Sequence, residues 1–251
     1  MNRHRQYLVR GWLALLLLTL MWDATGADVT VMRWIGSPTG FALQHEWWLE
    51  RVLHDGLRQA ATGVMVAVWA WALWPAKRLG LPRSERLTVA VLSVLGLLAV
   101  NLVKNASATS CPWDWTIFGG QVPAISHWAW GVFDGGPGRC FPGGHASSGM
   151  AFVTLALPWL WPVAREGRAP STGWWWLAAA LAVGLLAGFV QTLRGAHPPS
   201  HTAWTLLICG GVSLAGWALA RRWLASPAQA DVQRQINGHA GDDGAQHAAL
   251  P

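Results

Sequence analysis

Six long apolar segments dominate the sequence, and they constrain its fold more than any other feature does. The segments cover approximately residues 8–22, 57–74, 87–103, 146–163, 174–193 and 202–220. Their lengths approach the ~20 residues with which a helix crosses the hydrocarbon core of a bilayer. Backbone amides in lipid need partners within the chain, and no alternating pattern indicates a barrel. We therefore expect an all-α protein, a six-span integral membrane helical bundle.

The composition supports a membrane protein and excludes several other classes. Only 12% of the residues are charged, whereas a soluble domain carries about 25%. The chain also has 20 tryptophans, a residue type that concentrates where membranes meet water. The net charge is +6, but the lysines and arginines form no basic run or stripe, so no nucleic-acid partner is expected.

Lysine and arginine fall mainly on one side of the predicted spans. With the N-terminus placed inside, twelve of the 18 lie in inner segments and six in outer segments. The positive-inside rule then predicts a multi-pass protein of the inner or plasma membrane with both termini cytoplasmic. Residues 1–223 are expected to form the membrane domain, and residues 224–251, which lack apolar periodicity, a disordered cytoplasmic tail.

The first apolar segment allows two interpretations. A basic start, a short apolar stretch and the small residues Ala24, Thr25 and Gly26 fit a cleavable signal peptide. They also fit a retained first span, which we favour. Either interpretation leaves the remaining topology unchanged.

Polar residues interrupt the apolar pattern in three segments. These are residues 104–114 after the third span, 138–148 before the fourth, and 191–201 between the fifth and the sixth. In the predicted topology all three lie at the outer face of the membrane. Ionisable groups next to lipid are costly, so their convergence indicates a functional site.

Three cations and a glycine pair in these segments suit an anion. Lys104, Arg139 and Arg194 can surround phosphate oxygens, although each alone would be an ordinary interfacial anchor. Gly143 and Gly144 allow close approach of the backbone, and the helix that follows offers unpaired amides at its positive end. Together they predict a phosphate-binding site.

Two histidines lie beside these residues. His145 and His197 carry imidazoles, which titrate near neutral pH and can act as a proton donor and as a nucleophile. A lone histidine at a helix start would more simply be a hydrogen-bonded polar residue. Beside a phosphate site, the pair indicates phosphoryl-group chemistry.

The three segments resemble the type 2 phosphatidic acid phosphatase superfamily, whose fold is shared with vanadium haloperoxidases. The first motif of that superfamily is Lys, six residues, then Arg-Pro. Here Lys104 and Pro112 match, and Cys111 replaces the arginine. The chain looks like a divergent subfamily with Cys-Pro-Trp-Asp and Arg-Gly-Ala-His signatures.

The second and third motifs also match in part. The second is Pro-Ser-Gly-His, and residues 142–145 match it with Gly143 replacing the serine. The third is Ser-Arg, five residues, His, three residues, Asp. His197 aligns with its histidine, residues 190–191 replace Ser-Arg, and His201 replaces the aspartate. The resemblance therefore covers residues 104–201 with the spacing intact.

The resemblance implies an integral membrane phosphatase that acts on a lipid phosphate or diphosphate, with lipid phosphate and membrane lipids as its partners. By matching position, His197 would attack phosphorus and form a phosphohistidine, His145 would protonate the leaving oxygen, and Lys104 would hold the phosphoryl group. No metal and no cofactor is implied, because cations already stabilise the transferring group.

The replaced residues need substitutes. We infer from position that Arg139 and Arg194 supply the missing guanidinium groups, since both lie beside matched residues and arginine binds phosphate through two donors. The aspartate that would orient the imidazole of His197 has two candidate replacements. They are a neutral His201 and Asp114, and the latter equally fits a turn residue.

Cys111 and Cys140 both lie in the expected outer loop. A bridge between them would join the first and second motifs and would require an oxidising compartment. Two unpaired thiols are the alternative, and we favour the bridge. Cys209, inside the last span, is expected to be a buried apolar side chain.

Rival functions use the same residues. A metal-dependent membrane hydrolase could bind its ion through His145, His197 and His201, although prolines after His197 disturb the helical spacing and three cations would repel a metal. A non-catalytic protein that binds phosphate or lipid also fits the altered motifs. A transporter is opposed by the placement of the polar residues at one face rather than at the midplane.

Overall fold

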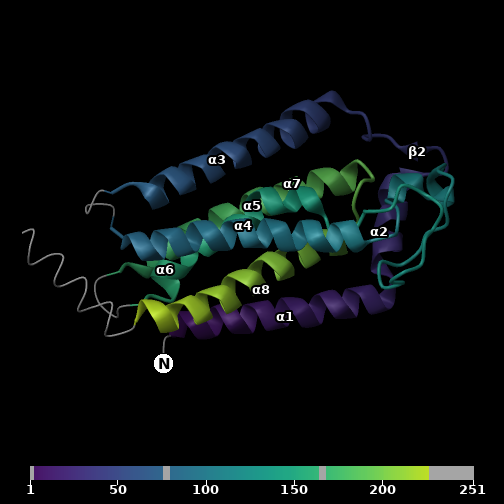
Figure 1. Cartoon of the computed structure of the whole chain (residues 1–251). Helices are drawn as coiled ribbons and strands as arrows, with labels where there is room; N and C mark the ends of the chain where they lie inside the picture. Colours follow the sequence, from purple (N-terminus) through teal and green to yellow (C-terminus); the bar gives the residue numbers. More distant parts are fainter. Residues whose placement is uncertain (1–2, 76–79, 164–167, 226–251) are drawn as a thin grey trace, which may run out of the picture.

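The computed structural model describes residues 3–75, 80–163 and 168–225, and it consists of helices with one short hairpin. In Figure 1 the long helices run beside one another, with the beginning of α1 and the end of α8 at the same end of the bundle. The long helices are α1 (Arg3–Thr25), α3 (Gly56–Leu73), α4 (Arg83–Ala106), α7 (Pro170–Leu193) and α8 (Pro199–Leu224). The predicted tail lies outside the described residues except for its first two positions, of which Leu224 ends α8.

Four helices of the described chain are long and apolar enough to cross a membrane. They are α1, α4, α7 and α8, and they correspond to the first, third, fifth and sixth predicted spans. The second predicted span forms α3, which is 18 residues long and is not among the four. The expectation of six spans is therefore not confirmed, whereas the all-α fold class is correct apart from the hairpin.

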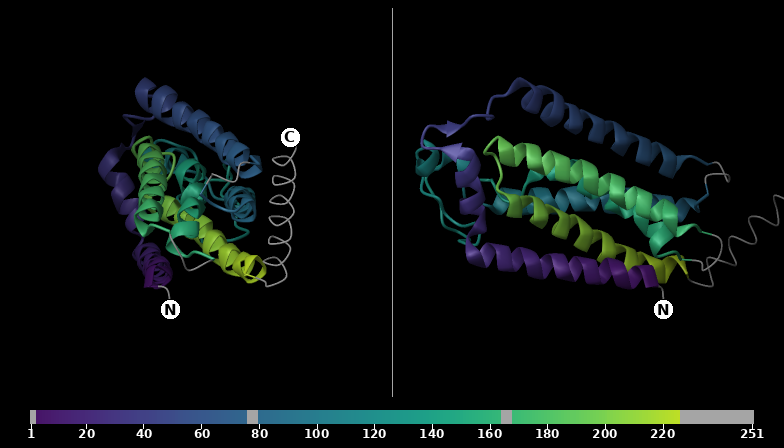
Figure 2. Two further views of the ribbon diagram at one scale, coloured as in Figure 1. Left: turned by 90° about the vertical axis from the view of Figure 1, so that its left-hand side faces the viewer. Right: turned by 180° about the vertical axis from the view of Figure 1, so that it is seen from behind.

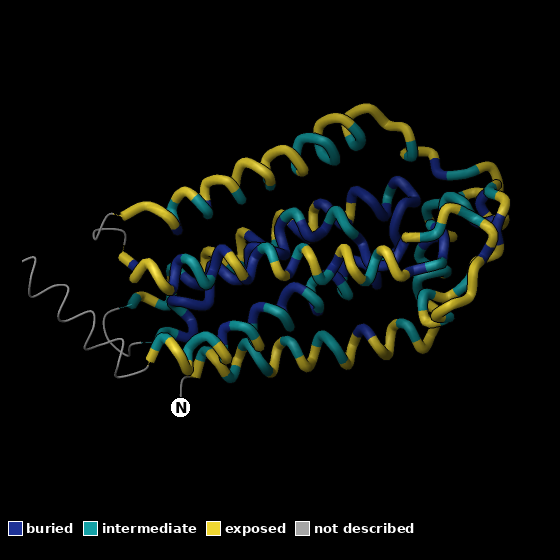
Figure 3. The backbone as a smooth tube through the Cα atoms, viewed as in Figure 1, coloured by how far each residue is buried: buried dark blue, intermediate teal, exposed yellow. Residues whose placement is uncertain are grey.

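The fourth predicted span is broken rather than continuous. It consists of α5 (Ser147–Met150), a 3₁₀ stretch η5 (Ala151–Ala156) and α6 (Leu157–Leu160). Residues 149–158 are all buried, because α4, α7 and α8 pack around this segment (Figure 3). Pro158 stands at the start of α6 and cannot donate an amide hydrogen bond to the preceding turn. Apolar periodicity does not reveal such a break.

Two glycines fix the approach of this central segment to α7. A Cβ atom on Gly149 would lie 2.3 Å from the backbone nitrogen of Gly184, and one on Gly184 would lie 2.5 Å from Cγ of Met150. Small residues let helix backbones in membranes come into direct contact. Since Gly149 lies four residues after His145, this contact also fixes the start of the segment that carries the histidine.

One end of the bundle carries a cap, at the right in Figure 1. It contains α2 (Ala27–Ile35), the strands β1 (Gly36–Ser37) and β2 (Gly40–Phe41), and the long connection between α4 and α5. Its own small core is formed by Met32, Phe41, Trp115, Phe118 and Val122. Figure 2 shows from behind that this cap lies opposite the end where α1 begins and α8 ends. The three polar segments of the sequence meet beneath the cap.

Candidate active site

The glycine pair before α5 is attached to the start of α8. The amide of Gly143 donates to the carbonyl of His201 at 3.1 Å, and Oγ1 of Thr205 donates to the carbonyl of Gly143 at 2.9 Å. A Cβ atom on Gly143 would lie 3.3 Å from the His201 carbonyl oxygen. The close approach explains why glycine occupies a position where the resembling family has serine.

Three histidines meet at this junction. His145 lies in the turn η4 (Gly144–Ala146), His197 lies between α7 and α8, and His201 lies in the first turn of α8. The ring centroids of His145 and His197 are 6.2 Å apart, and those of His197 and His201 are 5.7 Å apart. The first separation leaves room for a phosphoryl group within reach of both rings.

Lys104 approaches the same place from the last turn of α4. Its Cδ, Cε and Nζ atoms lie 3.6, 3.7 and 4.0 Å from the point where a Cβ on Gly144 would stand. The ammonium group is therefore next to the turn that holds His145. The lysine chain lies in ordinary van der Waals range of this position.

The two predicted arginines occupy different positions. Arg194 is 6% exposed; its Nε donates to the carbonyl of Gln44 at 3.0 Å, and its Nη2 lies 3.7 Å from Oε1 of Glu50. Arg139 is exposed, and its guanidinium donates to the side chain of Asn105, the residue after Lys104. The structure thus brings Arg194 into the interior of the site and leaves Arg139 at its rim.

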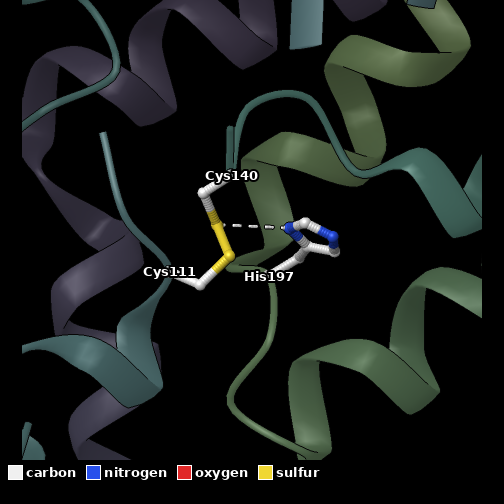
Figure 4. Close-up of side chains that lie close together, drawn as sticks. All are labelled: Cys111, Cys140 and His197. Carbon is white, nitrogen blue, oxygen red and sulfur yellow. Dashed lines mark hydrogen bonds between the residues drawn. A yellow bond between two sulfur atoms is a disulfide. The ribbon is translucent and has the colours of Figure 1, made fainter. Parts of the chain in front are cut away.

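Cys111 and Cys140 form a disulfide with their Cα atoms 5.0 Å apart, which confirms the predicted bridge. The bridge lies against His197, whose Nδ1 is 3.4 Å from Sγ of Cys140 (Figure 4). A proton on Nδ1 would point at this sulfur and leave Nε2 as the nucleophilic nitrogen. Because the sulfurs are bonded to one another, they are unavailable as thiolate ligands to a metal.

The side chain of Asp114 forms a hydrogen bond within its own turn. Its carboxylate accepts the amide of Cys111 at 3.3 Å at the end of the single turn η2 (Pro112–Asp114). Burial raises the pKa of this carboxyl, and the bond with the Cys111 backbone opposes the rise. Of the two candidates for orienting His197, His201 is the one whose ring lies beside it.

Both proposed catalytic imidazoles are held in the neutral form. Burial is the main cause that lowers the pKa of His145 to about 3, and the charges of His54, Lys104, Arg194 and Arg58 add to it. Burial also holds the pKa of His197 well below its usual range, followed by the charge of Lys104. A neutral His197 has a free lone pair for nucleophilic attack. To act as a proton donor, His145 would have to gain a proton when an anion enters the site.

Sequence reasoning missed a further set of residues before and within α3. His54 and Asp55 end a π-helical turn, η1 (Trp48–Asp55), and the ring centroid of His54 is 4.0 Å from that of His145. Glu50 pairs with Arg194, and Arg58 contributes charge at His145. The available signal was a dense run of ionisable residues, 50–58, directly before an apolar segment.

A cavity of about 480 Å³ opens beside His145 between α3 and α4. One part of its wall is polar and cationic, with Arg58, Lys104 and His145. The other part is apolar and continues along the helices, with Met65, Leu97 and Phe152. The cavity therefore suits a molecule with an anionic group at one end and a hydrocarbon body.

The metal alternative with His145, His197 and His201 gains no support from the geometry. Within the described ranges, two groups of three side chains bring their ligand atoms within 4.8 Å of one another, and this trio is neither of them. One group is Cys111, Cys140 and His197, whose sulfurs are in the disulfide. The other group is Asp28, His127 and His201, and it includes neither His145 nor His197.

Comparison with known proteins gives one match. The model of the PAP2 superfamily matches residues 85–224, which is more than half of the 251-residue chain. No curated protein and no solved structure matches the chain. The matched range contains the three polar segments, whereas Glu50, His54 and Arg58 lie before it.

Proposed function

Because the chain belongs to the PAP2 superfamily of phosphatase-type membrane enzymes, we propose that it hydrolyses a lipid phosphate or diphosphate through a phosphohistidine. One observation carries the choice of a lipid. The cavity of about 480 Å³ joins Lys104 and His145 to an apolar wall between α3 and α4. A lipid entering from the bilayer would place its phosphate at Lys104 and His145, on the side of His145 from which its ring approaches that of His197, and its chains along the helices.

The positions of the two imidazoles support the following reaction. Nε2 of His197 attacks phosphorus while the bond from phosphorus to the leaving oxygen breaks, and His145 gives its proton to that oxygen. Water then attacks the phosphohistidine, His145 takes a proton from the water, and inorganic phosphate leaves. The ring separation of 6.2 Å between His145 and His197 supports both steps around a single phosphorus.

Cations would stabilise the charge that develops on the phosphoryl oxygens. Lys104 and Arg194 contribute from inside the site, and Arg139 with the amides of Gly143 and Gly144 contributes from the rim and the turn. Arg194 meets Glu50 at 3.7 Å. A phosphate that binds the guanidinium would therefore displace this carboxylate, whose side chain is 41% exposed.

The setting in the membrane is part of the proposal. We place residues 1–223 in a membrane phosphatase domain, with the active site at the outer, periplasmic face and the termini in the cytoplasm. The distribution of lysine and arginine supports this orientation. So does the position of the site at the end of the bundle opposite the beginning of α1 and the end of α8 (Figure 1).

Phosphate release tests the proposal. The full chain would be purified in detergent and assayed with phosphatidic acid, a prenyl diphosphate and lipid A, together with a water-soluble phosphate monoester of similar leaving group. We expect faster turnover of at least one lipid than of the soluble ester and no turnover by His197→Ala.

Covalent trapping tests the mechanism separately. Substrate labelled in the phosphate should give an acid-labile, base-stable phosphoprotein in the wild type and none in His197→Ala. Unchanged activity in that variant would remove the proposed nucleophile. Binding of lipid phosphates without any release of phosphate would favour the non-catalytic alternative, a protein that binds lipid phosphates.

A further inference from the structure

A second cavity, of about 230 Å³, lies between the cap and the start of α8, and His201 forms part of its wall. Its wall includes Asp23 at the end of α1, Asp28 in α2, His127 in the loop between α4 and α5, and His201 in α8. Asp28, His127 and His201 each offer one ligand atom, and these three atoms lie within 4.8 Å of one another. None of the three comes from the walls of the phosphate cavity.

The negative charge at this cavity has no permanent cation beside it. Neither lysine nor arginine is among the residues that line it. The side chain of Asp23 is 5% exposed, and it pairs with the ring of His127. A buried charge costs free energy unless a partner compensates it. Neutral donors hold both carboxylates in place: the indoles of Trp128 and Trp204 donate to Asp23, and Trp22 and Ser200 donate to Asp28. These donors carry no positive charge, so two carboxylates beside two imidazoles still favour an added cation.

One proposed ligand and the neighbouring Asp23 each carry a buried polar atom that makes no hydrogen bond within the described residues. Nδ1 of His201 is buried and has no hydrogen-bond partner in the described structure, and the same holds for Oδ1 of Asp23. His201 is 5% exposed, so solvent does not satisfy its ring. A buried polar atom without a partner is costly, and a bound ion would remove that cost.

His127 has the arrangement of a metal ligand. Its Nε2 lies 3.2 Å from Oδ2 of Asp23, and its ring stacks on Phe141 with centroids 4.3 Å apart and planes within 5°. Histidines that bind metals usually donate their other ring nitrogen to a carboxylate, which fixes the ring and its tautomer. The contact with Asp23 would fix the ring of His127 in the same way.

We propose that Asp28, His127 and His201 bind a zinc ion. Two imidazole nitrogens and one carboxylate oxygen form a donor set that zinc accepts, whereas calcium and magnesium prefer oxygen alone. The ion would join α2, the loop of the cap and α8. It would also hold His201 at its place 5.7 Å from His197, outside the phosphate cavity. This proposal does not depend on the proposed activity.

The test measures metal directly. The full chain, purified in detergent with an affinity tag that lacks histidine, would be loaded with zinc, desalted and analysed by mass spectrometry for zinc per chain. His127→Gln removes one ligand, and His45→Gln changes an exposed histidine at the same end of the bundle. We expect one zinc per wild-type chain and per His45→Gln chain, and about 100-fold weaker zinc binding by His127→Gln.

Two further readouts separate lost binding from lost folding. Zinc should raise the melting temperature of the wild type, because a ligand of the folded state stabilises it, and should leave that of His127→Gln unchanged. Cobalt in place of zinc should give the visible absorption of a tetrahedral site in the wild type. Wild-type protein without stoichiometric zinc, or a folded His127→Gln variant that binds zinc as tightly as the wild type, would overturn the proposal.

Discussion

The imidazole rings of His54 and His145 lie with their centroids 4.0 Å apart, and Nδ1 of His54 is 2.9 Å from Oδ1 of Asp55. His145 is largely buried, and its pKa is lowered to about 3, mainly by burial. The side chain of His54 is 19% exposed and that of Asp55 is 36% exposed. The pair therefore stands between solvent and the imidazole that must gain and lose a proton, on a π-helical turn of a kind frequent at functional sites.

Replacing His54 should slow proton transfer without abolishing binding. We expect His54→Gln to lower kcat by about tenfold and to change KM little. The effect should be smaller than the loss of a group that transfers the proton directly, because His54 would act through His145. Steady-state kinetics against pH would measure it, with His45→Gln as the control. A His54→Gln enzyme with wild-type kcat at every pH would exclude His54 from the proton path.

Removing the carboxylate of Glu50 should free Arg194 for phosphate. The pair is 3.7 Å apart and Glu50 is partly exposed, so we expect only a modest gain, about two- to fivefold tighter inhibition by inorganic phosphate or vanadate in Glu50→Gln. Arg194→Ala should weaken the same inhibition by about 100-fold. Arg51→Ala, which removes a side chain that is 67% exposed, is the control. Weaker inhibition in Glu50→Gln would show that the carboxylate supports the site instead of competing with the anion.

The buried histidines should make the protein sensitive to acid. The pKa of His145 is about 3 in the folded chain, against an ordinary value of 6.5, so between these values the unfolded state binds the additional proton. The contribution of His145 to stability is therefore complete above pH 6.5 and falls as the pH drops toward 3. From pH 6.5 to 5 this amounts to about 2 kcal/mol.

Thermal unfolding at pH 7.5 and 5.0 would measure this dependence. The fall in melting temperature between the two values should be smaller in His145→Gln than in the wild type, and should keep its size in His45→Gln. An equal fall in all three proteins would mean that His145 takes up its proton as readily in the folded chain as in the unfolded chain.

The contact between α5 and α7 should tolerate no added atom. A Cβ on Gly149 would lie 2.3 Å from the backbone nitrogen of Gly184, so Gly149→Ala should destabilise the chain by about 3 kcal/mol and displace His145. Gly63→Ala in α3 is the matched control, since a Cβ there meets nothing within 4 Å. Melting temperature and kcat would both be measured. A Gly149→Ala protein as stable as Gly63→Ala would contradict the described packing.

The residues of the site differed in how far sequence could predict them. Lys104, His145 and His197 could be predicted as site residues because motif spacing is a property of the chain, and Arg194 because it lies beside a motif. Glu50 and His54 were missed because nothing local shows that the segment before α3 folds back over the turn at His145. The 3₁₀ stretch of the fourth predicted span was missed because its apolar residues also suit an α-helix, so apolar periodicity does not separate the two kinds of winding.

The bridge between Cys111 and Cys140 closes directly against Nδ1 of His197. A newly made chain with two free thiols has not yet joined its first and second motifs, and the proposed nucleophile, His197, lacks the disulfide as its neighbour on that side. In the proposed orientation, the site would be completed only after this loop is exported, once an oxidant at the outer face of the membrane has formed the disulfide. Before that step, the chain would not act on lipid phosphates at the cytoplasmic face, where it is synthesised.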